Sequence, residues 1–460
     1  MSHPLLASST ERSLPIWLVN EATWPKVVAD LPPAAQGFAK AQGFEAKAGS
    51  YCLLPDADGG LLGVAFGLDG EDARHVNPFL AGKLPTVLPE GVYRFETQAP
   101  DPSLAVLAWL LGAYSFDRYR KRPAKSVRLV VPDGVDGDEI SRIAEAVAAS
   151  RDLVNTPTSD LGPDGIEAAA RRLADRRGAS FSSIVGDDLI KQNFPMIHAV
   201  GRASATPPRL IDFTWGREDA PRITLVGKGV AFDTGGLDIK PSSSMLLMRK
   251  DMGGAAATLA LADMIMGAGL PVRLRVLIPA VENSISGNAF RPGDILPSRK
   301  GITVEIGNTD AEGRLILADA LAFADEESPD LLVDFATLTG AARVALGPEL
   351  PPFYTDDDAL AADIARHGMA ENDPVWRMPL WAPYQSQLDS KFADMNNTGG
   401  PMAGSITAAL FLRRFVSAAR GYVHFDIFAW NNATKPGRPE GGEVQAARLM
   451  YALVKERYGS

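Results

Sequence analysis

The chain has 460 residues, of which 46% are hydrophobic and 22% are charged, so it can form two domains and is neither disordered nor fibrous. Its formal net charge of −10 disfavours a general attraction to nucleic acid or to anionic membranes. The single cysteine, Cys52, excludes an internal disulfide and a cysteine-built metal cluster, and it favours a reducing, cytoplasmic location.

The N-terminal part of the chain mixes short strands with one helix. Apolar runs at Tyr51–Leu54, Gly60–Phe66 and Val127–Val131 predict strands, and Ser103–Arg118 predicts a helix. No apolar run reaches the length of a membrane span, so we expect no membrane association. We predict a small α/β domain over residues 1–135.

The rest of the chain alternates between strands and helices. Helical spacing and an acidic first turn in Gly137–Ala148 predict a linking helix over residues 136–152. The predicted strands that follow are 222–226, 272–278, 302–306, 331–335 and 421–427, and the predicted helices are 254–267, 312–326 and 404–418. This alternation predicts an α/β fold, in which a larger domain over 153–460 has a central mixed or mostly parallel sheet flanked by helices.

Charged residues gather where these predicted strands end. The segment Asn308–Leu315 brings two carboxylates and a guanidinium together directly after a strand, an arrangement that is costly unless a cation is bound there. In an open α/β sheet, ligand sites form at strand ends and helix starts. The candidate site residues are Lys228, Asp233, Lys240, Asp251, Asp310, Glu312 and Arg314.

These residue types suit a pair of divalent ions. Two ions about 3.5–4 Å apart can polarise a carbonyl and generate hydroxide from bridging water near neutral pH. Oxygen-rich sites favour Mn, Mg or Zn over soft metals. One lysine could bind a metal as a neutral amine, while a second, charged lysine could stabilise a developing oxyanion. The five histidines are scattered along the sequence, so a histidine-built zinc site is not expected.

Six strings of the sequence carry a family pattern: Val226–Gly229, Phe232–Gly236, Ile239–Pro241, Asp251–Ala256, Asn308–Leu315 and Ala336–Ala341. In the same order and with matching gaps, they resemble the leucyl aminopeptidase family of two-metal cytosolic peptidases. The resemblance covers residues 150 to 430, and it is fainter in the N-terminal part, around Leu110–Tyr119. By this resemblance the N-terminal domain is macro-like.

The resemblance implies roles for individual residues. Lys240 matches the residue that stabilises the tetrahedral intermediate, and Arg314 matches the one that holds a bicarbonate ion acting as general base. The matches to the metal ligands are Lys228, Asp233, Asp251, Asp310 and Glu312, with Asp233 and Glu312 in the bridging positions. The matches to the substrate pocket are Met248, Thr337, Leu338 and Gly340.

The resemblance also implies the reaction and the assembly. We expect release of the N-terminal residue from short peptides, with bridging hydroxide as nucleophile, two Mn or Zn ions (Mg is a further option) and bicarbonate as cofactors. A homohexamer whose active sites face an internal cavity is implied as well. Two segments, Gly399–Ser405 around Pro401 and Asn431–Glu443 around Lys435, depart from the family's pattern.

Some candidate residues also have simpler structural explanations. Asp251 could simply cap the helix that follows it, and Lys228 could be a surface lysine or a phosphate contact. We expect Asp319 to be an exposed charge of its helix, and His424 to be a packed core histidine rather than a ligand.

Two other functions compete with a metal-dependent aminopeptidase. Carboxylate-held metal pairs serve phosphoesterases equally well. The third hypothesis is a binding protein, for example a nucleic-acid partner, that keeps the fold but catalyses no reaction. The complete set of polar site residues and the acidic net charge disfavour this third hypothesis. We therefore predict a metal-dependent aminopeptidase.

Overall fold

The computed structural model describes residues 3–70, 73–121 and 125–459. The chain divides into two compact units, Met1–Ala148 with Asn432–Glu440, and Ala149–Asn431 with Gly441–Ser460. Helix α5 (Gly137–Asn155) contains the point at which the units divide. The boundaries at residues 135 and 152 stay a prediction, to which the structure adds that Asn432–Glu440 groups with the first unit.

The first unit is built on a mostly parallel sheet. Its strand order is β1 (Leu6–Ala7), β6 (Val127–Val130), β5 (Gly91–Phe95), β2 (Leu14–Val19), β4 (Leu61–Gly67) and β3 (Tyr51–Pro55). Neighbouring strands run parallel except β4 and β3, which are antiparallel. The sequence predicted β3, β4 and β6, and the structure confirms them.

Helix α4 (Pro102–Gly112) confirms the predicted helix of this unit but ends six residues before Arg118. Asp101 caps it, because its side chain accepts a hydrogen bond of 2.9 Å from the backbone of Leu104. Where the helix ends, the backbones of Gly112 and Gly82 meet: a Cβ on Gly112 would lie 2.0 Å from the Gly82 carbonyl oxygen. This close approach requires glycine.

The second unit contains the main sheet. Its strand order is β16 (Trp376–Arg377), β15 (Pro352–Tyr354), β18 (Tyr422–Asp426), β14 (Leu331–Ala336), β9 (Arg222–Gly227), β11 (Arg273–Asn283), β8 (Arg209–Trp215) and β7 (Ser180–Val185), and β10 (Gly229–Asp233) also pairs with β11. Strands β18, β14, β9 and β11 are parallel, whereas β8 and β7 add antiparallel pairs at one edge. The sheet is therefore mixed and parallel at its centre, as predicted.

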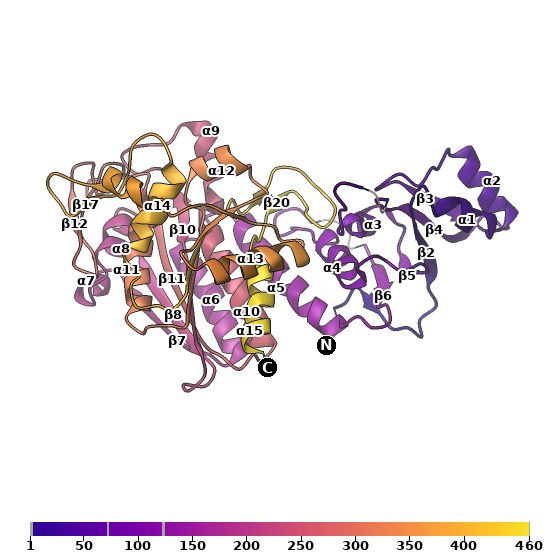
Figure 1. The fold of residues 1–460 in the computed structure, drawn as a ribbon, viewed down its shortest axis with the longest axis horizontal. Helices are drawn as coiled ribbons and strands as arrows, with labels where there is room; N and C mark the ends of the chain where they lie inside the picture. Colours follow the sequence, from indigo (N-terminus) through magenta and orange to yellow (C-terminus); the bar gives the residue numbers. More distant parts are fainter. Residues whose placement is uncertain (1–2, 71–72, 122–124, 460) are drawn as a thin grey trace. The chain divides into compact units, whose positions relative to one another are not determined.

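Helices cover both faces of this sheet (Figure 1). One face carries α6 (Pro163–Arg177), α10 (Gly253–Gly267), α13 (Asp358–Ala370) and α15 (Ala447–Tyr458), and the other carries α8 (Pro195–Gly201), α11 (Glu312–Asp325) and α14 (Gly404–Arg413). Because both faces are covered, the central strands read as continuous hydrophobic runs, which is why the sequence predicted them. The predicted helix 404–418 is α14, which ends at Arg413.

The predicted strand 302–306 lies outside the main sheet. It forms β13 (Thr303–Glu305), which pairs with β12 (Ile295–Pro297) and β17 (Met395–Asn396). This small sheet leads directly into the loop before α11. It therefore positions the segment that carries Asp310 and Glu312.

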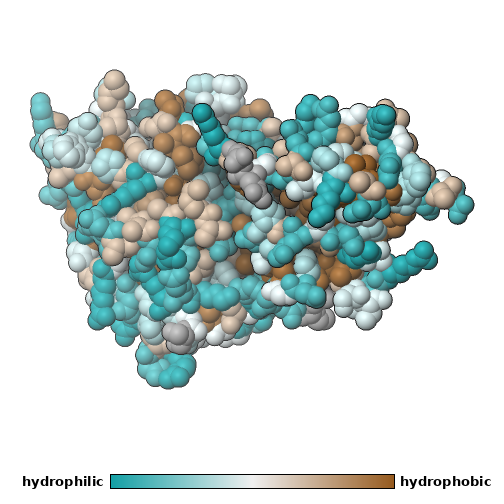
Figure 2. Space-filling model, turned by 45° about the vertical axis from the view of Figure 1, so that its right-hand side comes forward, coloured by the Kyte–Doolittle hydropathy of each residue, from teal (hydrophilic) through white to brown (hydrophobic). Residues whose placement is uncertain are grey.

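One face of the protein carries mainly polar side chains (Figure 2). On the face in Figure 2, hydrophilic residues cover most of the area, and hydrophobic residues show in separate patches. Within the described parts of the chain, no helix is both long and apolar enough to cross a bilayer.

Candidate metal centre

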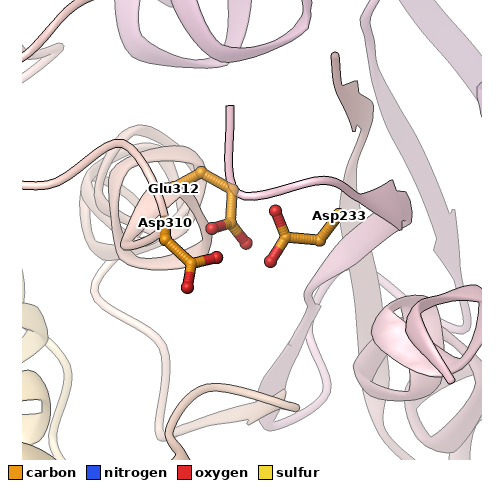
Figure 3. Close-up of side chains that lie close together, drawn as sticks. All are labelled: Asp233, Asp310 and Glu312. Carbon is orange, nitrogen blue, oxygen red and sulfur yellow. The ribbon is translucent and has the colours of Figure 1, made fainter. Parts of the chain in front are cut away.

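Three carboxylates converge in the second unit. Asp233 ends β10, Asp310 lies in the loop before α11, and Glu312 is the first residue of that helix. The three side chains point toward one another (Figure 3), and one oxygen from each lies within 4.8 Å of the others. Asp233 and Glu312 are only 3% and 1% exposed. Buried carboxylates this close repel one another unless cations lie between them.

Two lysines supply part of that positive charge. Lys228, in the turn between β9 and β10, places its Nζ 2.8 Å from Asp251 Oδ2 and 2.9 Å from Glu312 Oε1. Lys240 Nζ lies 2.8 Å from Asp233 Oδ2 and forms a second ion pair with Asp310. Asp251, in the 3-10 helix η2 (Met248–Met252), thereby joins the group. The predicted ligands come together as the sequence suggested.

Glycines make room for Lys228. A Cβ on Gly313 would lie 2.5 Å from Lys228 Cε, and a Cβ on Gly254 would lie 2.8 Å from Lys228 N. After Asp233 the chain turns through Gly235, whose φ is +87°. The glycine-rich strings in the sequence therefore have a steric cause.

The electrostatics of the site favour added cations. Burial, together with the charge of Asp233, raises the pKa of Glu312 to about 8, and the same two causes raise that of Asp310 to about 6. Burial opposes a charge on Lys228, but Asp251 and Glu312 raise the pKa of this lysine well above its usual value. Four carboxylates face two ammonium groups, so negative charge is in excess.

The donor set fits divalent metal ions. Carboxylate oxygens suit Mn, Mg and Zn, and the excess negative charge matches what such ions would neutralise. Apart from their ion pairs with Lys228, Asp251 Oδ2 and Glu312 Oε1 have no hydrogen-bond partner among the described residues. These oxygens therefore keep acceptor capacity for a metal. The neighbouring carboxylates favour the protonated form of Lys228, so this lysine must lose a proton before its amine can bind a metal.

Arg314 lies in the first turn of α11 and is 7% exposed. Its Nη1 donates to the Asn397 carbonyl oxygen at 2.7 Å, while its Nε has no hydrogen-bond partner among the described residues. Burial lowers the pKa of Arg314 to about 10. A buried guanidinium nitrogen without a partner can bind an anion.

The predicted substrate-pocket residues lie on the segments that surround Asp251. Thr337 Oγ1 donates to Asp251 Oδ1 at 2.8 Å, and Leu338 N donates to Asp426 Oδ1 at 3.0 Å. Met248 begins η2, and Gly340 begins α12 (Gly340–Leu346). Their role toward substrate stays a prediction.

Two residues that position the site, Asn283 and Thr309, were not among the predicted site residues. Asn283, fully buried at the end of β11, donates through Nδ2 to Asp233 Oδ1 at 2.8 Å and to the Thr309 carbonyl oxygen at 3.1 Å. Thr309 Oγ1 donates to the Gly235 carbonyl oxygen at 2.6 Å. The available signal for Asn283 was the pair of polar residues, Glu282 and Asn283, that follows the hydrophobic run of β11.

The prediction for Asp319 is wrong. Its side chain is 0% exposed and accepts hydrogen bonds from the backbone nitrogens of Met196, Ile197 and Arg299. It therefore caps the start of α8 from a distant part of the chain. His424 is a core histidine, as predicted: it is 1% exposed, and its Nδ1 lies 2.6 Å from Asp334 Oδ1.

Comparison with known proteins decides the family. The profile "Cytosol aminopeptidase family, catalytic domain" matches residues 148–451, and "M17 aminopeptidase, N-terminal domain" matches residues 14–132. The chain belongs to the cytosol aminopeptidase family. This confirms the resemblance to leucyl aminopeptidases and the two-domain α/β fold, and it identifies the chain as a leucyl aminopeptidase-type hydrolase.

Relatives in this cytosol aminopeptidase family match most of the chain. A probable cytosol aminopeptidase of Syntrophotalea carbinolica is 41% identical over 365 residues, 75% of this chain and 73% of the relative. A probable cytosol aminopeptidase of Chlorobium phaeobacteroides is 36% identical over 454 residues, 90% of each chain.

Two solved structures share the whole fold. The cytosol aminopeptidase from Coxiella burnetii superposes with a TM-score of 0.94 at 44% identity, over 98% of this chain and 99% of that one. The bottromycin maturation enzyme BotP in complex with Mn superposes with a TM-score of 0.86 at 32% identity, over 97% of this chain and 100% of that one. Both units are thus present in related enzymes.

Proposed function

We propose that the chain is an aminopeptidase that releases the N-terminal residue from short peptides by means of two divalent ions. Family membership supports a metal-dependent aminopeptidase. The observation that carries the metal site is the convergence of Asp233, Asp310 and Glu312 within 4.8 Å. Asp251 and Lys228 would complete the set of residues that hold the ions, and by the family resemblance Asp233 and Glu312 would each serve both ions.

The metal ions supply a Lewis acid for the scissile carbonyl and a hydroxide nucleophile near neutral pH. Asp233, Asp251, Asp310 and Glu312 hold them through oxygen ligands. We propose Mn first, because the related enzyme BotP is known in complex with Mn, and Zn or Mg as alternatives. Asn283 keeps Asp233 in place through its hydrogen bond of 2.8 Å.

Lys240 and Arg314 are proposed to act on the reacting groups. The Lys240 ammonium, held beside Asp233 and Asp310, would stabilise the negative oxygen of the tetrahedral intermediate. Arg314 would bind bicarbonate as the general base, and the missing partner of its Nε supports this role. Bicarbonate dependence of the rate tests the second assignment.

The segments around Asp251 are proposed to bind substrate. Thr337 contacts Asp251 directly, and Met248 lies on the same 3-10 helix as that carboxylate. Leu338 and Gly340 follow Thr337 along the chain. Backbone groups of this turn would then hold the peptide in an extended form beside the metals.

We further propose a cytoplasmic homohexamer that acts on short peptides. The relatives' printed names, cytosol aminopeptidases, support the location. Large hydrophobic side chains stand exposed in the second unit, and such groups are commonly buried in oligomers. The most exposed of them are Leu246, Val344, Phe392, Met402 and Met369.

Hydrolysis assays decide between this function and the alternatives. The protein is stripped of metal with a chelator, reloaded separately with Mn, Zn or Mg, and assayed on aminoacyl-anilides and on a phosphate ester. We expect metal-dependent release of the aminoacyl group and no phosphate release. Phosphate ester cleavage alone would support a phosphoesterase instead, and a salt-dependent DNA complex without peptidase activity would support a binding protein.

A further inference from the structure

Lys250 is a buried lysine without a polar partner. It is 2% exposed, and its Nζ makes no hydrogen bond or ion pair with any residue in the described ranges. The Nζ lies 4.8 Å from the centroid of the Phe428 ring. A cation–π contact offsets only part of the cost of burying an ammonium group.

A second cation lies at the same ring. The guanidinium carbon of Arg343 is 4.9 Å from the Phe428 centroid, and its positive charge repels the Lys250 ammonium, which Asp251 attracts from a distance. Arg343 is half-buried in α12, where its Nη1 donates to the Thr339 carbonyl oxygen at 3.1 Å. Two cations around one aromatic ring are unfavourable unless an anion joins them.

The nearby carboxylates have other partners. Asp426 accepts hydrogen bonds from Leu338 N, Thr339 N and Thr339 Oγ1, at 3.0, 3.1 and 2.6 Å. Asp251 pairs with Lys228 and accepts from Thr337. Neither carboxylate makes a direct contact with the Lys250 ammonium.

The ring and its cations adjoin the candidate metal centre. Lys250 directly precedes Asp251, and Phe428 directly precedes Ala429. A Cβ on Gly253 would lie 2.2 Å from the Ala429 Cβ and 3.1 Å from Thr337 Cγ2, so Ala429 and Thr337 lie side by side. Lys250 is therefore on the segments to which we assign substrate binding.

We propose that Lys250 and Arg343 form a subsite that binds a carboxylate of the peptide substrate. The inference rests on the proposed aminopeptidase function and names the class of substrate that it favours. The carboxylate could be the side chain of an N-terminal Asp or Glu, or the free C-terminal carboxylate of a dipeptide. In either case it would give the Lys250 ammonium the charged hydrogen bond that the protein does not supply.

Substrate ratios in matched variants test the subsite. The Mn-loaded wild type, Lys250→Met and the control Lys391→Met are assayed on glutamyl- and leucyl-anilide, and on Leu-Gly and its C-terminal amide. The control removes a lysine from an exposed position outside the segments assigned to substrate binding. Circular dichroism checks the fold of each variant, and Arg343→Gln replaces Lys250→Met if the latter does not fold.

Loss of a charged hydrogen bond predicts a fall of at least about ten-fold in one ratio of kcat/KM for Lys250→Met and not for the control. A fall in the glutamyl-to-leucyl ratio assigns the subsite to an N-terminal side chain, and a fall in the acid-to-amide ratio assigns it to the C-terminal carboxylate. If both ratios match those of the control while leucyl-anilide is hydrolysed, the subsite is wrong and the proposed function stands. If the wild type hydrolyses no aminoacyl-anilide, both are wrong.

Discussion

Lys228 is held between two carboxylates with only 3% of its side chain exposed. The sequence predicted that this lysine and the acidic residues would meet, because the strings that carry them end predicted strands or begin predicted helices. It did not predict the pairing itself, Lys228 with Asp251 and Glu312, since side-chain geometry depends on loop conformation. Asn283 escaped prediction for the same reason: its contact with Asp233 spans 50 residues of chain.

Glu312→Gln tests a bridging ligand. The amide keeps the shape of the side chain but removes a negative charge from the proposed metal site, so we expect kcat to fall at least about 100-fold with the fold intact. Activity on leucyl-anilide and circular dichroism measure the two effects. The control Glu326→Gln changes a carboxylate near the end of the same helix that pairs with Arg299. Near-normal turnover by Glu312→Gln would refute its assignment.

Lys240→Met tests the oxyanion role. A preorganised cation acts mainly in the transition state, so kcat should fall by about 10²–10³ while KM changes less. The exposed Lys391→Met serves as the control for loss of a lysine. A rise in KM with unchanged kcat would show instead that Lys240 binds the ground state.

At the scale of elements, the central parallel strands of the main sheet were easier to predict than its edge strand β7. β9 and β14 are covered on both faces and have hydrophobic runs, whereas β7 (Ser180–Val185) alternates exposed and half-buried residues and carries three serines. Asp319 was misread because its role is non-local. A charge within a helix predicts a solvent-facing position, but here the carboxylate caps α8, 123 residues away in the sequence.

Asp319 also gives a pH prediction. Burial raises its pKa to about 7, although three backbone N–H groups oppose this shift, while the ordinary value is 3.8. Between pH 4 and pH 7 the unfolded chain has lost this proton and the folded protein keeps it. The free energy of unfolding should therefore decrease with rising pH, by up to about 1.4 kcal/mol per pH unit from this group.

Asp319→Asn should flatten that dependence, since the amide does not titrate in this range. Chemical denaturation of the metal-free protein at pH 5 and pH 7 measures the slope for the wild type, for Asp319→Asn and for the exposed control Asp389→Asn. An equal slope in all three proteins would mean that Asp319 is ionised throughout.

At the scale of the whole molecule, composition and the order of elements predicted a two-domain α/β protein, because alternation of strands and helices constrains the sheet. The grouping of Asn432–Glu440 with the first unit was not predictable, since it depends on contacts far apart in sequence. Composition did not predict the oligomeric state. In the structure, exposed hydrophobic side chains such as Leu246 and Val344, 80% and 91% exposed, favour a surface that binds a partner.

Light scattering tests the proposed assembly. We expect a particle with six times the 49.0 kDa mass of one chain. Val344→Glu should lower that mass if the residue lies in an interface, because it would bury an unpaired charge there. A wild-type particle with the mass of a single chain would contradict the hexamer.

Anomalous diffraction from crystals grown with Mn tests whether the carboxylates hold a pair of divalent ions. We expect two Mn peaks per chain, about 3.5–4 Å apart, among Asp233, Asp251, Asp310 and Glu312, with Lys228 moved from ion pairing to ligation. Crystals saturated with Mn that show no peak between these carboxylates, or that hold Mn only elsewhere, would contradict this expectation.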